Sequence, residues 1–135
     1  MSAANTWSRA VLVDDGGRSV AVDVNGFELS CDVPMDPEPD PGGPTPMGLL
    51  AASLSACTAM SARTFLQRWR RVPGEISVRV AVLPGPEPAL LREVSVEGAV
   101  EPDLREQLAA VVDGTPVTVL LRQSLTIRTV LRTGE

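Results

Sequence analysis

The feature that most constrains the fold is an uncharged stretch in the middle of the chain. Sixteen consecutive residues, 47–62, contain no charged side chain. Thr45-Pro46 precedes them and is typical of a helix N-cap and first helical position. We therefore expect one helix from Met47 to about Trp69, before Pro73-Gly74. A helix that is apolar on every side is buried or crosses a membrane. Because a bilayer requires roughly 20 apolar residues, we expect burial and no membrane.

Shorter segments on both sides of this helix alternate between apolar and polar residues, as strands do. Asn25-Gly26 is a typical hairpin turn. The loop over residues 33–44 holds five prolines and two glycines, which preclude a regular element. The expected strands cover residues 7–13, 19–24, 27–32, 75–82, 89–100 and 125–131, and a second helix covers 102–112.

This order, βββ-α-ββ-α-β, predicts an α+β fold. The length suits a single domain over residues 1–135. One small sheet covers only one side of a helix that is apolar all round. We therefore expect a second copy of the chain to cover the rest, which makes the protein a homodimer.

Composition excludes several classes of function. The net charge is −5, which argues against a nucleic-acid partner. The chain has no histidine, so a histidine-ligated metal site and Ser-His-Asp or Cys-His catalysis are excluded, and we expect no metal and no cofactor. Two cysteines do not make a disulfide scaffold. The N-terminal residues lack the apolar core of a signal peptide, so we expect a cytoplasmic protein.

The two cysteines, Cys57 and Cys31, are the candidate reactive groups. Cys57 lies about three turns inside the expected helix, where it is either a small core residue or a reactive thiol. Cys31 shares one strand face with Phe27 and Leu29. It is either a core residue or a second thiol that pairs with Cys57, which requires their Cα atoms to lie within roughly 7 Å.

The segment from Gly42 to Met60 resembles the OsmC/Ohr (organic hydroperoxide resistance) family. That family has a Gly/Pro loop, a Pro-x-x-Leu-Leu-Ala-Ala run, and then a reactive Cys followed by Thr-Ala-Met in one large subgroup. Here the run is residues 46–52, and the cysteine is Cys57. Arg63 also fits that subgroup, and residues 113–117 resemble the family's Asp-x-Cys-Pro-Val.

The resemblance implies an intertwined homodimer whose two central helices are wrapped by sheets from both chains. It also implies a peroxidase that reduces organic hydroperoxides with a cysteine thiolate. An arginine stabilises the thiolate in that chemistry, and a glutamate ten residues before the cysteine holds the arginine. A second cysteine resolves the sulfenic acid as a disulfide, and a reductant restores the dithiol.

Two of these groups are missing from the sequence. Met47 stands at the glutamate position and Thr115 at the second cysteine position. Arg18, in a Gly-Gly-Arg setting, matches the family's N-terminal arginine and is otherwise a solvated turn residue. Ser53, Ser61 and Arg63 are, with Met47, candidates to line a pocket around Cys57. Otherwise Ser53 and Ser61 are small packing residues and Arg63 is part of a solvated helix end.

Two functions of different classes follow from this. The first is a one-cysteine thiol peroxidase in which Cys57 is oxidised by an apolar hydroperoxide and reduced by an external thiol. The second is a non-enzymatic dimer that binds a small apolar ligand in the interface pocket. Met47 in place of a carboxylate favours the second function, because it makes the mouth of that pocket more apolar.

Overall fold

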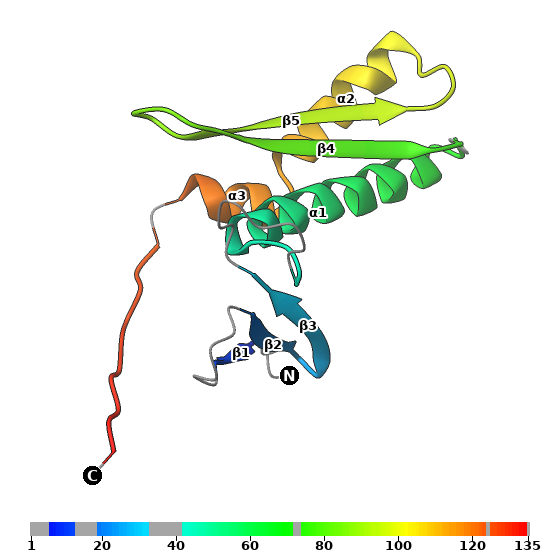
Figure 1. The fold of residues 1–135 in the computed structure, drawn as a ribbon. Coiled ribbons are helices and arrows are strands. Elements are labelled where there is room, and N and C mark those ends of the chain that lie inside the picture. The colour runs from blue at the N-terminus through cyan, green and yellow to red at the C-terminus, as the bar shows by residue number, and fades with distance from the viewer. Residues whose placement is uncertain (1–5, 13–18, 33–41, 72–73, 124, 135) are drawn as a thin grey trace, which may run out of the picture. The chain divides into compact units, whose positions relative to one another are not determined.

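The structure is a computed structural model. It describes residues 6–12, 19–32, 42–71, 74–123 and 125–134. The mixed α+β class is confirmed (Figure 1). The elements are β1 (Ser8–Val11), β2 (Val20–Val24), β3 (Phe27–Cys31), α1 (Pro46–Arg68), β4 (Ile76–Leu83), β5 (Ala89–Val96), α2 (Pro102–Asp113) and α3 (Pro116–Arg122).

Two compact units make up the chain, residues 1–52 and residues 53–135, and the boundary falls within α1. The expectation of one domain over residues 1–135 stays a prediction. The first unit holds the antiparallel sheet β1-β2-β3. Its second hairpin turns at Asn25 and Gly26, whose φ angles of 48° and 95° suit a type I′ turn. Gly26 N–H donates to Asp23 Oδ1 at 2.7 Å, so the predicted turn is confirmed.

Residues 42–44 run beside the end of β3 within the first unit. Asp32 N–H donates to the Pro44 carbonyl at 3.0 Å, and the buried Asp32 carboxylate accepts the Gly42 N–H. A Cβ atom on Gly43 would collide with the carbonyl oxygen of Ser30. Glycine is therefore required at position 43, where one backbone approaches another closely.

Both ends of α1 are capped by local hydrogen bonds. Gly48 N–H donates to Thr45 Oγ1 at 3.0 Å, which confirms the predicted N-cap. At the other end, Arg71 N–H donates to Leu66 O at 2.9 Å and Arg70 N–H to Gln67 O at 3.0 Å. Arg70 has a φ of 54°, so it takes the left-handed position of a Schellman cap that glycine usually occupies.

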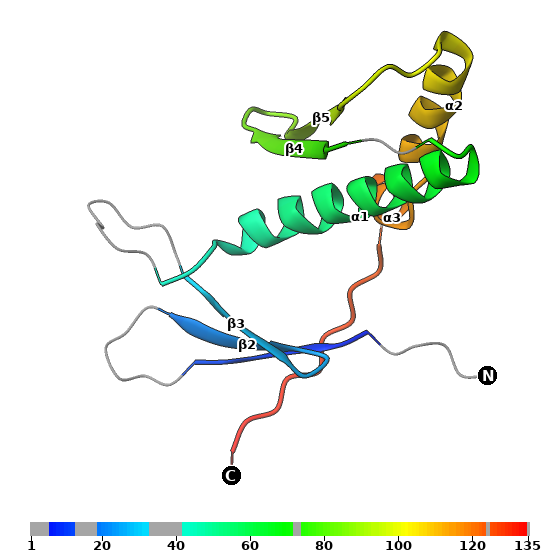
Figure 2. The same ribbon diagram turned by 90° about the vertical axis from the view of Figure 1, so that its right-hand side faces the viewer.

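The second unit packs the β4-β5 hairpin along α1, as Figures 1 and 2 both show. The buried residues of α1 recur every four positions, which places them on one stripe. Ala62 forms a core with Leu108 and Val112 of α2, and Phe65, Ile76 and Val96 pack against it. The buried stripe consists of Leu54, Thr58, Ala62 and Leu66.

The predicted burial of α1 on all sides is not found in the single chain. Met60 is 62% exposed, because the hairpin and the two short helices of the second unit cover only one side of its part of α1, and Met47, in the first unit, is 52% exposed. By length and apolar composition α1 also matches a membrane-spanning helix, but the core helix of a soluble protein passes the same test.

The end of the chain differs from the predicted order. Residues 125–134 form neither helix nor strand and are exposed throughout, which corrects the strand expected over 125–131 (red in Figure 1). A strand needs a hydrogen-bonded neighbour, and in the described part of the chain none pairs with this segment. The structure also contains α3, which the predicted order lacks, and β5 ends at Val96 instead of residue 100.

Candidate functional site

Cys57 lies on α1 at the edge of the buried stripe. Its side chain is half-buried and its thiol is free, whereas the next residue, Thr58, is fully buried. Residues 53–61 all belong to α1. Ser53 and Ser61 therefore lie one turn before and one turn after Cys57 on the same face of the helix. Ser53 is exposed and Ser61 is half-buried. This face of α1 is therefore partly open in the single chain.

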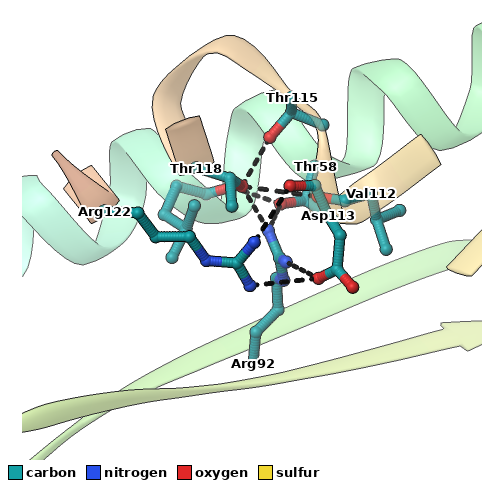
Figure 3. A network of polar contacts seen from close by, with 8 residues as sticks. Thr58, Arg92, Val112, Asp113, Thr115, Thr118 and Arg122 are labelled. Atoms are coloured by element: carbon teal, nitrogen blue, oxygen red, sulfur yellow. Dashed lines mark hydrogen bonds and ion pairs between the residues drawn. The ribbon is translucent and has the colours of Figure 1, made fainter. Parts of the chain in front are cut away.

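A network of polar side chains meets α1 at the residue that follows Cys57 (Figure 3). Its centre is Arg92 of β5, whose side chain is only 13% exposed. One terminal nitrogen of Arg92 donates to Thr58 Oγ1 at 3.0 Å and to Thr118 Oγ1 at 2.7 Å. The other donates to Asp113 Oδ1 at 3.2 Å. Arg92 thus ties β5 to α1, α2 and α3.

Thr115, which the resemblance places at the position of the family's second cysteine, belongs to the same network. Its side chain is 2% exposed, and its Oγ1 lies 2.6 Å from Thr118 Oγ1. Thr115 is the N-cap residue of α3, yet its hydroxyl makes no capping hydrogen bond. Position 115 is therefore linked to Thr58, the neighbour of Cys57, through Thr118 and Arg92 (Figure 3).

The charges in this network do not cancel. Asp113 pairs with Arg92 at 3.2 Å and with Arg122 at 3.3 Å, so one carboxylate faces two guanidinium groups. Asp113 and Arg122 are well exposed, whereas Arg92 is largely shielded from solvent. The partly buried end of the network therefore carries excess positive charge, and partial burial strengthens its field.

The other predicted site residues are spread over both units. Met47, the second residue of α1, and Cys31, the last residue of β3, belong to the first unit, where Cys31 is 6% exposed. The pairing of Cys31 with Cys57 stays a prediction. Arg18 lies outside the described residues. Arg63 and Ser61 line two separate hollows of the second unit, and neither hollow includes Cys57 among its lining residues.

Sequence reasoning missed Arg92, Thr118 and Asp113 as parts of the site. A signal for Arg92 was present, because it shares a strand face with Leu90 and Val94, where an apolar residue is expected. A charged residue on the face of a strand that otherwise carries apolar side chains indicates a buried polar partner. Among the described residues, no three His, Cys, Asp or Glu side chains lie close enough together to hold a metal ion.

The fold and the site define a class: a small α+β protein with one free, half-exposed cysteine on its longest helix, beside a buried arginine–threonine network. The family model for OsmC-like protein matches residues 22–130. The chain therefore belongs to the OsmC-like family. No curated protein sequence matches it.

Solved structures with the same fold are low in sequence identity. The OsmC-like protein of Mycoplasma pneumoniae is 18% identical with a TM-score of 0.67, and the match covers 87% of each chain. The organic hydroperoxide resistance protein OhrB of Bacillus subtilis is 16% identical with a TM-score of 0.60, over 87% of this chain and 90% of that one. An organic hydroperoxide resistance protein from Elizabethkingia anophelis is 21% identical with a TM-score of 0.61, over 90% of each chain. At these identities the likeness shows the fold.

Proposed function

We propose that this chain is a one-cysteine thiol peroxidase that reduces apolar organic hydroperoxides. The observation that carries the proposal is Cys57. It is free and half-exposed on α1, and the resemblance implies that it stands where the family has its reactive thiol. The names of the Bacillus and Elizabethkingia proteins, which refer to organic hydroperoxide resistance, support this substrate class.

In the proposed reaction, the Cys57 thiolate attacks one peroxide oxygen and the O–O bond breaks. The leaving alkoxide takes a proton and departs as an alcohol, and the sulfur becomes a sulfenic acid. An external thiol then condenses with the sulfenic acid and releases water. A second external thiol reduces the mixed disulfide and restores Cys57. In this scheme Arg18 stabilises the thiolate, as the resemblance implies.

The Thr115 contacts support an external reductant. A hydroxyl cannot form a disulfide, and the Thr115 hydroxyl is held 2.6 Å from that of Thr118. An intramolecular disulfide would therefore need Cys31 instead, and the peroxidase test includes that cysteine. A reducing cytoplasm supplies small thiols and keeps both cysteines reduced, which favours that compartment.

The proposed active form is a homodimer. Met47 and Met60 are exposed on α1, and Ile127 and Leu131 are each 85% exposed near the end of the chain. Large exposed apolar surfaces of this kind indicate a partner, and a second copy of the chain is the simplest one. The extended residues 125–131 would then pair with a strand of the partner chain.

The test is the rate at which reduced protein consumes cumene hydroperoxide with dithiothreitol present. We expect fast consumption that Cys57→Ser abolishes and Cys31→Ser leaves unchanged. Loss in both variants would instead make Cys31 the resolving thiol. A wild-type rate no greater than that of a free thiol would refute the peroxidase.

A variant at position 115 tests whether a resolving thiol can act from there. Thr115→Cys should restore a resolving thiol, so that one equivalent of hydroperoxide produces a disulfide between Cys57 and the introduced thiol within the chain. Thr64→Cys, at an exposed position of α1, is the matched control and should not form such a disulfide rapidly.

A non-enzymatic ligand-binding protein is the second candidate function. The observation that favours it is the half-exposed Met47 near the start of α1, where the family places a glutamate. In that case the wild-type protein would consume no hydroperoxide beyond the background of a free thiol. It would bind small apolar molecules with an affinity that Met47→Glu weakens.

A further inference from the structure

A hollow of about 630 Å³ lies between β5 and α2 in the second unit, apart from Cys57. One wall is formed by alternate residues of β5 and the other by one face of α2, and residues 98–100 of the segment that connects them also line it. Its volume falls in the usual range for small-molecule sites. The residues that line the two walls include Arg92, Val94 and Val96 on β5 and Arg105, Leu108 and Ala109 on α2.

The floor of this hollow is apolar and belongs to the protein core. Leu108 and Val112 are 7% and 9% exposed and form the core with Ala62, and Val96 packs against them. Removing these side chains would disturb the core itself. The hollow is therefore formed before any ligand enters, which lowers the cost of binding.

The charged groups of the hollow are cationic. Arg92 and Arg105 line it, and none of the described carboxylates does. The three hydrogen bonds of Arg92 use its terminal nitrogens and leave Nε without an acceptor among the described residues. Every fully buried polar side-chain atom in the described part has a partner, so Nε must be reachable by solvent. Arg105 makes no side-chain hydrogen bond or ion pair with the described residues.

Local charge makes an anion the complementary ligand. Asp113 already balances Arg92 and Arg122 together, so the Arg92 end carries excess positive charge. Arg105 adds a second cation about 10 Å further along α2, since it precedes Val112 by seven residues. Residues 125–134, in which Arg128 and Arg132 are the only charged side chains, would be repelled.

We propose that this hollow binds an unbranched carboxylate of about the length of octanoate. The carboxylate accepts the Arg92 Nε–H, and the chain lies over Val94, Val96 and Leu108 towards Arg105, whose stem covers it and whose charge adds attraction. The inference does not depend on the proposed peroxidase, because no atom of Cys57 takes part.

The experiment titrates octanoate into Cys57→Ser protein by isothermal calorimetry, with 1-octanol and acetate as the tail-only and head-only probes. Octanoate should saturate one site per chain, and each of the other two probes should bind at least about ten times more weakly. Arg105→Ala should weaken octanoate binding several-fold and 1-octanol binding less, because 1-octanol loses only its contact with the arginine stem and octanoate also loses the attraction of the charge.

A matched pair of variants tests the location. Ala109 and Ala110 are neighbouring exposed residues of α2, and of the two only Ala109 lines the hollow. Ala109→Phe fills the hollow and should reduce octanoate affinity at least about tenfold, whereas Ala110→Phe should leave it unchanged. Circular dichroism checks that both variants fold, and substitution of Arg92 is avoided because it holds four elements together.

Three results would overturn the inference. The first is equal affinity for octanoate and 1-octanol, which would remove the role of charge. The second is an equal loss in Ala109→Phe and Ala110→Phe. The third is a change of oligomeric state in Ala109→Phe alone, which would mean that a second copy of the chain occupies the hollow. Octanoate binding without peroxidase activity would leave the inference intact and refute only the proposed function.

Discussion

Replacement of Thr118 by valine should destabilise the protein strongly, although the two side chains have nearly the same shape. Thr118 is 5% exposed. Its Oγ1 accepts from Arg92 at 2.7 Å and lies 2.6 Å from Thr115 Oγ1, and its own hydroxyl reaches Val112 O at 3.4 Å. Valine keeps the volume and removes all three contacts.

The cost follows from the two groups that lose a partner. The Thr115 hydroxyl is 2% exposed and makes no other side-chain hydrogen bond within the described residues. One N–H of Arg92 also loses its acceptor. An unsatisfied buried polar group costs about 1–3 kcal/mol. Arg92 recovers part of this from solvent, so the free energy of unfolding should fall by roughly 2–4 kcal/mol.

Urea denaturation followed by tryptophan fluorescence measures this change. Thr64→Val is the matched control, because Thr64 is exposed and its hydroxyl bonds only to Met60 O within the described ranges, so its effect should stay within about 0.5 kcal/mol. In an Arg92→Met background, Thr118→Val should cost less, because the Arg92 N–H that would lose its acceptor is already absent. If Thr118→Val and Thr64→Val were equally mild, the network would not contribute to stability.

Three further predictions concern other positions. The hydrogen bond from Arg71 is the largest cause that lowers the pKa of Glu101 below its ordinary value of 4.5. The stabilising effect of Glu101 is therefore complete above pH 4.5 and is lost as the pH falls through the lower folded-state pKa. In urea titrations from about pH 7 to pH 3, the advantage of wild type over Glu101→Gln should disappear at the acidic end. Arg70→Gly should raise the free energy of unfolding measured in urea by up to about 1 kcal/mol, because it relieves the left-handed φ of 54°, whereas Arg70→Ala should not. Gly43→Ala should lower thermal stability, because its Cβ meets Ser30 O, and an unchanged melting temperature would contradict that contact.

Local signals were sufficient to predict most of the fold. The Thr45 cap, the Asn25-Gly26 turn and the alternating strands before residue 97 all form where the sequence indicates them. Each of these depends on residues that are neighbours in the chain. The same Thr-Pro pattern recurs at Thr115-Pro116, where it begins α3, although the predicted order of elements contains no helix after residue 112.

The site was harder to predict because its contacts are distant in the sequence. Cys57 is recognised through a family pattern, but the contact from Arg92 to Thr58 joins residues 34 positions apart. Nothing local to Thr118 marks it as a partner of Arg92. The strand predicted over residues 125–131 is wrong for a related reason. Its hydrogen bonds need a neighbouring strand that the described part of this single chain does not contain.

The exposed end of the chain also bears on the time course of folding. Leu125, Ile127, Val130 and Leu131 stay in water as long as the chain is alone. If a second copy covers them, the last step of folding is a collision between two chains, and its half-time shortens as protein concentration rises. Until that collision the apolar segment is open to any other exposed strand edge, so aggregation also becomes faster as concentration rises. The yield of refolded protein should therefore pass through a maximum at an intermediate concentration.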